Sequence, residues 1–135
     1  MYNKIIGQIN VALSIGLGVV NHYLGGWDLL LNTFIVLVIL DFVTGWLNAI
    51  FTKRLSSEIG SKGVARKIVI FIIIAVANLL QELLNDTIPL REIILMFYIV
   101  NEALSIIENA AYFVPIPEKL KQVILQLNQN REEEK

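Results

Sequence analysis

Cysteine is absent from this 135-residue chain, and histidine occurs once, at His22. The absence of cysteine excludes a disulfide framework, a thiol nucleophile and a cysteine-based zinc site. A single histidine leaves no partner set for a histidine-based catalytic triad, and no metal-ligand spacing occurs. The glycine-rich pieces GLGVV and GSKGVARK match neither a phosphate-binding loop nor a dinucleotide fingerprint. The sequence therefore predicts a protein that is not an enzyme and that holds no metal and no cofactor.

Charged residues are also scarce, at 17% of the chain, against about 25% in soluble domains. Hydrophobic residues reach 56%, and the mean hydropathy is +0.65. The few charges gather in short segments, so no broad basic face is available to bind nucleic acid. The length suits one domain. We therefore predict a single integral membrane domain over residues 1–135, with membrane lipids as its surroundings and no nucleic-acid partner.

Four apolar stretches, separated by turn-forming residues, predict membrane-spanning helices at about 5–24, 29–51, 68–84 and 90–113. The second would reach about 35 Å, enough to cross a hydrocarbon core of about 30 Å, and Asp28 suits its N-cap. The first is diluted by polar residues and, if it lies on the membrane surface, three spans remain. The predicted fold is an all-α bundle of four, or alternatively three, transmembrane helices.

The C-terminal region is predicted to leave the membrane after the fourth span. Pro115 and Pro117 end that helix, and apolar residues then recur at Leu120, Val123, Ile124 and Leu127. This spacing predicts a short amphipathic cytoplasmic helix over 117–128, resting on the inner membrane surface or on a partner helix. Residues 129–135 are expected to form a solvated, disordered tail.

Basic residues are unevenly distributed between the predicted connections. The segment 52–67 contains five, Lys53, Arg54, Lys62, Arg66 and Lys67, whereas the turn at 25–28 has none and the turn at 85–91 has only Arg91. Because cytoplasmic loops are enriched in lysine and arginine, we predict that 52–67 is a cytoplasmic basic loop held against anionic lipid. With four spans, both termini are then cytoplasmic.

Small residues mark two candidate sites of helix packing. Gly7 and Gly18 belong to a stripe of small and polar residues on the first helix, and Gly45 and Ala49 form a small-xxx-small pair on the second. Such residues let membrane helices approach closely. The stripe on the first helix is also compatible with a face that lines water in an assembled pore, and a cleaved signal peptide is a third interpretation.

Two carboxylates lie near the centres of predicted spans, Asp41 in the second and Glu102 in the fourth. A charged carboxylate at that depth costs about 2.5–3.5 kcal/mol. No lysine or arginine is predicted at matching depth, so no ion pair is expected to offset this cost. Asn78 and Asn101 are available as hydrogen-bond partners instead.

The fourth predicted span concentrates its polar side chains on one half of its circumference. The candidate pore-lining or gating residues of the chain are Asp41, Asn78, Asn101, Glu102, Ser105, Glu108 and Asn109. Three interpretations are open: a buried hydrogen-bonded network, a face that turns to water when copies assemble, and a proton relay of a transporter.

Two long stretches carry a family resemblance. LDFVTGWLNAIFTKRLSSEIGSKGVARKI resembles the D-x-x-T-G, L-S-S-x-x-G-x-x-G and K arrangement of the toxin-secretion/phage-lysis holins, and NEALSIIENA with VPIPEKLK resembles their N-E-x-x-S-I-x-E-N and P-I-P-E-K-L motifs. These motifs cover residues 37–128 in the family's order. The signature falls on Asp41, Thr44, Gly45, Ser57, Gly60, Gly63, Lys67, Asn101, Glu102, Ser105, Glu108, Asn109 and Pro117.

The resemblance implies a phage-encoded or prophage-encoded multi-pass protein of the host's cytoplasmic membrane. Such a protein assembles into homo-oligomeric lesions that time cell lysis by releasing an endolysin, or in some settings a toxin, without needing to contact it. Two alternatives use the same helix packing without forming a lesion: a structural or accessory oligomeric membrane protein, and a small ion or proton transporter.

Overall fold

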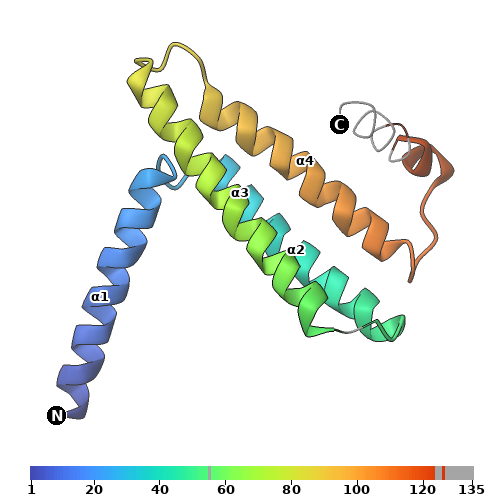
Figure 1. The fold of residues 1–135 in the computed structure, drawn as a ribbon, viewed down its shortest axis with the longest axis horizontal. Coiled ribbons are helices and arrows are strands. Elements are labelled where there is room, and N and C mark those ends of the chain that lie inside the picture. Colours follow the sequence, from blue (N-terminus) through green and yellow to red (C-terminus); the bar gives the residue numbers. More distant parts are fainter. Residues whose placement is uncertain (55, 124–125, 127–135) are drawn as a thin grey trace.

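The computed structural model describes residues 1–54, 56–123 and 126, and this part of the chain contains helices and no strand. The helices are α1 (Tyr2–Tyr23), α2 (Leu29–Phe51), α3 (Ser57–Leu83) and α4 (Leu90–Ala110). Figure 1 shows α2, α3 and α4 running alongside one another, whereas α1 leaves the α2–α4 bundle at an angle. The prediction of an all-α fold is confirmed.

The helix bounds agree with the prediction except at the start of α3. The second helix has the predicted bounds, and the first and fourth differ by a few residues at their ends. α3 begins at Ser57 rather than at residue 68, so most of the predicted loop 52–67 is helical and that boundary was wrong. Glu58 lies in the first turn of α3, where an acidic side chain interacts favourably with the helix dipole. The helix forms although Gly60 and Gly63 follow, each of which lowers helix stability by about 1 kcal/mol relative to alanine.

The turn between α1 and α2 is built from glycine and an N-cap. Gly25 and Gly26 have φ angles of 83° and 92°, a region that residues with a side chain rarely adopt. Asp28 then accepts a hydrogen bond from the Leu31 backbone N–H at 2.9 Å. The predicted N-cap is therefore confirmed, and it fixes the point at which α2 enters the bundle.

The apolar core lies in the half of the bundle near this turn. Its fully buried side chains are Leu31 and Phe34 of α2, Ile74 of α3 and Leu95 of α4. The Phe34 and Phe71 rings meet edge to face at 5.2 Å, so large side chains separate α2 from α3 here. α4 packs along both of those helices. α1 contributes no buried residue.

Most large apolar side chains of the described residues are exposed on the outer faces of the helices. Three helical segments are long and apolar enough to cross a membrane: Tyr2–Tyr23, Leu29–Phe51 and Gly60–Leu83. These features are those of a membrane protein. α4 is not one of the three, so the fourth span stays a prediction.

The predicted amphipathic helix at 117–128 is described only in part. Residues 118–123 are helical. Residues 124, 125, 127 and 128 of that segment, and the predicted tail at 129–135, lie outside the described residues. The placement of this helix on a membrane surface stays a prediction.

Candidate functional site

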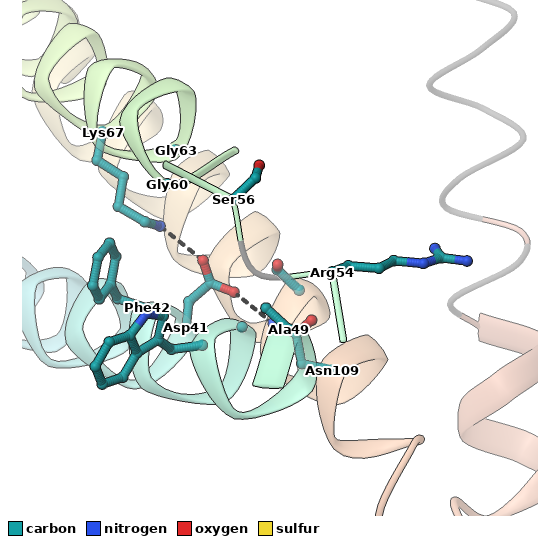
Figure 2. Close-up of a pocket in the computed structure, with 12 residues that line it drawn as sticks. Asp41, Phe42, Ala49, Arg54, Ser56, Gly60, Gly63, Lys67 and Asn109 are labelled. Atoms are coloured by element: carbon teal, nitrogen blue, oxygen red, sulfur yellow. Dashed lines mark hydrogen bonds and ion pairs between the residues drawn. The ribbon is translucent and has the colours of Figure 1, made fainter. Parts of the chain in front are cut away.

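Three helices each contribute one charged side chain to a cluster in the middle of the bundle. Lys67 of α3 lies between Asp41 of α2 and Glu102 of α4, and its Nζ is 2.8 Å from Asp41 Oδ2 and 2.5 Å from Glu102 Oε2. The side chains are largely buried, with 15% of Lys67, 15% of Asp41 and 8% of Glu102 exposed. Figure 2 shows the Lys67 ammonium directed at the Asp41 carboxylate. We call these three residues the ion-pair cluster.

The position of Lys67 corrects two expectations. The sequence predicted no cation at the depth of the carboxylates and assigned Lys67 to the basic loop, and both predictions were wrong. Because α3 starts at Ser57, Lys67 lies about three turns inside the helix. Its ammonium therefore reaches both carboxylates and offsets the cost of holding them among apolar helices.

A row of hydrogen bonds extends the cluster along the contact between α2 and α4. Asn109 Nδ2 donates to Asp41 Oδ1 at 3.3 Å and to Thr44 Oγ1 at 3.4 Å. Asn48 Nδ2 donates to Asn109 Oδ1 at 3.4 Å. Asn109 thus holds the Asp41 carboxylate oxygen that Lys67 does not contact, and this fixes the orientation of the carboxylate.

Two cavities lie on either side of the cluster. One, of about 240 Å³, opens between α2 and the start of α3, and the other, of about 310 Å³, opens between α3 and α4. Asp41, Gly63, Lys67 and Ser105 line both cavities. The structure therefore brings together, in the cluster or on the walls of these cavities, the predicted residues Asp41, Asn101, Glu102, Ser105, Glu108 and Asn109.

Asn78 does not belong to this site, although the sequence offered it as a partner of the mid-helix carboxylates. Its Nδ2 donates to Glu82 Oε1 at 2.9 Å on the same helix. Asn78 lies three turns beyond Lys67 along α3, beside the α1–α2 turn. The early start of α3 places Lys67, and not Asn78, at the level of Asp41 and Glu102.

The predicted packing residues fall into two groups. A Cβ atom added at Gly45 would lie 3.5 Å from Asn109 Nδ2, an ordinary van der Waals contact, so Gly45 faces the α4 side chain that holds Asp41. Ala49 lines the cavity between α2 and α3. Gly7 and Gly18 face open space within the protomer, and their role in packing stays a prediction.

The remaining basic residues of 52–67 are exposed, two at the α2–α3 connection and two on the first turns of α3. Lys62 pairs with Glu58 at 2.8 Å across one turn of α3. Lys53, Arg54 and Arg66 are likewise exposed. Apart from Lys67, therefore, the basic residues of this segment lie at the protein surface, but only Lys53 and Arg54 belong to the connection between the helices. Their cytoplasmic location stays a prediction.

Sequence reasoning missed Arg91, which was counted only as a charge in a turn. Arg91 is 2% exposed, and its Nε donates to the Leu24 carbonyl oxygen at 2.5 Å. Its terminal nitrogens donate to the Gly26 carbonyl at 3.1 Å and to the two Asp28 carboxylate oxygens at 2.7 and 3.2 Å. A side chain at Gly25 would collide with the Arg91 guanidinium. Arg91 thus joins the α1–α2 turn to the start of α4, and we call these contacts the Arg91 clamp.

The Arg91 clamp also sets the charge state of Asp28, which lies outside the helices. The hydrogen bond from Arg91 lowers the pKa of Asp28 below its ordinary value of 3.8, and this effect outweighs the opposing effect of burial. Because the pKa is lowered on folding, the stabilisation by this carboxylate is complete above its ordinary pKa and is lost as the pH falls through the lowered one. The clamp is therefore intact at neutral pH.

Comparison with known proteins gives a consistent set of relatives. Residues 18–129 match the sequence profile of the bacteriophage holin family. A 14.9 kDa protein of Clostridium perfringens, named for its position in the nagH 3′ region, is 46% identical over 109 residues, which cover 79% of this chain and 83% of the relative. A probable holin of Bacillus phage phi105 is 36% identical over 102 residues, which cover 75% of this chain and 76% of that protein. No solved structure matches the chain.

Proposed function

The chain belongs to the bacteriophage holin family, and we propose that it oligomerises in the cytoplasmic membrane of a bacterial host and forms lesions that release an endolysin. The observation that carries the proposal is the ion-pair cluster, in which three helices share buried charges that the protein could expose to water. A helix bundle whose only role was passive anchoring would gain nothing from placing two carboxylates and an ammonium between apolar helices.

The mechanism that we propose is an exchange of partners. In the resting protomer, Lys67 pairs with both Asp41 and Glu102 while these groups are shielded from solvent. When copies gather, α4 would turn its polar side, which carries Asn101 and Glu108, toward water. Hydration of the separated charges would then replace the ion pairs, and the free energy of hydration would favour the open assembly.

The membrane potential would bias this exchange. A charge that moves across the full potential gains or loses about 2.3 kcal/mol per 100 mV. The ion-pair cluster contains one ammonium and two carboxylates, so rearrangement of its helices moves unbalanced charge through the field. Collapse of the potential would thus change the relative free energies of the resting and open forms.

The orientation that we propose places the basic α2–α3 connection in the cytoplasm. Lys53 and Arg54 lie at that connection and are exposed, as expected for a positively charged inner loop. The turns at Leu24–Asp28 and at 84–89 would then face outward, with the Arg91 clamp at the outer surface. With α4 as a fourth span, both termini lie in the cytoplasm.

The proposal predicts timed lysis when the chain is expressed in a bacterium together with a separate cytoplasmic endolysin that lacks an export signal. Because the endolysin has no other route to the cell wall, culture turbidity should fall abruptly after a reproducible delay. The matched controls express the endolysin alone and the chain alone. If both proteins accumulate and the culture keeps growing, the chain does not form lesions, and a structural or accessory role is favoured.

A further inference from the structure

The cavity between α2 and the start of α3 has a shape that packing within the protomer does not explain. At the core end, large side chains such as Phe34 and Phe71 fill the space between the two helices. At the other end, α3 presents Gly60 and Gly63, and a Cβ atom at either glycine would meet no atom within 4 Å. The glycines therefore leave an open groove of about 240 Å³, which nothing in the described chain fills.

The α2 side of this groove is apolar. Phe42, Trp46 and Ala49 of α2 line it, and Figure 2 shows Phe42 and Ala49 on that helix. Phe42 and Trp46 are both large aromatic residues, and 46% of Phe42 and 60% of Trp46 remain exposed. An α-helix is about 10 Å across with its side chains, too wide for a groove of this volume. A single hydrocarbon chain fits such a space.

The rim of the groove is cationic. Arg54 lines its outer end, and Figure 2 shows its guanidinium extending away from the ion-pair cluster toward the surface. The ion pairs found among the described residues do not include Arg54. The nearby Glu58 is already paired with Lys62, and the Asp41 carboxylate at the inner end is held by Lys67 and Asn109. An anionic group at the rim would thus meet a cation that has no ion-pair partner among the described residues.

From this geometry we infer that the groove between α2 and α3 is a binding site for one glycerophospholipid with an anionic headgroup. The acyl chain would lie over Gly60 and Gly63 and against Trp46, and the phosphate would pair with Arg54. The basic loop then recognises an individual lipid through one arginine, in addition to the general attraction of its charges to an anionic surface. Such a lipid would occupy the space between α2 and α3 beside the ion-pair cluster and keep the two helices apart.

The test uses the fluorescence of Trp46, which lines the groove. The Trp27→Phe variant leaves Trp46 as the sole tryptophan of the chain, and Trp27 lies outside the groove. The purified protein is placed in phosphatidylcholine vesicles that contain phosphatidylglycerol, with bromine on the acyl chains of one lipid at a time. We expect brominated phosphatidylglycerol to quench Trp46 with about fivefold higher relative affinity than brominated phosphatidylcholine, the ratio that one basic residue contributes at an anionic surface.

Two pairs of variants distinguish lipid binding in the groove from general attraction of anionic lipid to the basic surface. Arg54→Gln and Lys53→Gln remove the same charge from adjacent exposed positions, and only Arg54 lines the groove. The preference should disappear in Arg54→Gln and persist in Lys53→Gln. Gly60→Leu fills the groove and should also abolish the preference, whereas Gly16→Leu, at an open position of α1, should keep it.

Three results would overturn the site. Equal quenching by the two brominated lipids in the parent would show no lipid selectivity. Equal loss in Arg54→Gln and Lys53→Gln would show surface attraction only. Quenching that falls as the protein-to-lipid ratio rises would show that a second copy, not a lipid, covers Trp46. None of these results bears on timed lysis, so the lipid site and the proposed function fail independently.

Discussion

Lys67→Met should lower the free energy of unfolding by about 3–5 kcal/mol, because it leaves the Asp41 and Glu102 carboxylates without their shared cation. Both carboxylates lie within hydrogen-bonding distance of the Lys67 ammonium and are largely buried. Methionine keeps the length and the apolar character of the lysine stem. The decrease in the free energy of unfolding therefore reports the removal of the ammonium charge and not a change in side-chain volume. The thermal unfolding midpoint of the purified protein in detergent is the measurement.

The matched control neutralises the whole cluster. In the triple variant Asp41→Leu, Lys67→Met and Glu102→Met, no charge is left unpaired, and replacement of a buried ion cluster by hydrophobic residues of similar volume is often neutral or stabilising. We expect its midpoint to return close to that of the parent. The same triple variant should accumulate in cells and fail to lyse them on time, because it has no charges to hydrate. A Lys67→Met protein as stable as the parent would show that the ion pairs do not hold the bundle together.

Arg91→Ala should detach α1 from the bundle while leaving α2, α3 and α4 packed. The substitution removes the donor to the Leu24 and Gly26 carbonyls and to the Asp28 carboxylate. α1 has no buried residue of its own, so the Arg91 clamp is the principal restraint on its direction. Charge-assisted hydrogen bonds contribute about 1.5–3 kcal/mol each, and loss of several should exceed what the sparse packing of α1 can replace.

Distances between spin labels on α1 and α3 measure this effect. The natural chain has no cysteine, so Leu13→Cys and Ile72→Cys, at two exposed positions, accept labels without competing sites. We expect a narrow distance distribution in the parent and a broad one in Arg91→Ala. Glu92→Gln is the control, since its 3.5 Å contact with Arg91 is long and should be dispensable. A distribution unchanged by Arg91→Ala would contradict the role of the clamp.

The sequence identified the carboxylates of the site but not their cation. Asp41 and Glu102 interrupt long apolar stretches, and a charge in such a position is conspicuous without any structure. Lys67 was hidden because serine, glycine and basic residues crowd the segment before it, a composition typical of a loop. The signal that could have found it is Ser57 followed by Glu58, which is compatible with a helix start and would have placed Lys67 inside α3.

The Arg91 clamp could not be predicted from local pattern alone. Arg91 lies in the first turn of α4, two residues after Pro89, and charged residues at helix starts are usually solvated. Its burial depends on the contact between this helix start and the α1–α2 turn, which are more than sixty residues apart in the chain. Only the tertiary arrangement, with Gly25 leaving space for the guanidinium, brings the arginine to Asp28.

The measurement that tests the account most directly is the exposure of the ion-pair cluster to water before and after lesions form. A spin label at Asn101→Cys, beside Glu102 in the α3–α4 cavity, reports nearby deuterium in D₂O by electron spin-echo modulation. A label at Ile72→Cys gives the deuterium signal expected in an apolar environment (the apolar limit), and a label at Lys53→Cys gives the signal expected in water (the aqueous limit). The account predicts a signal near the apolar limit in the resting protein and near the aqueous limit in the lesion. A signal that stays at either limit in both forms would contradict it.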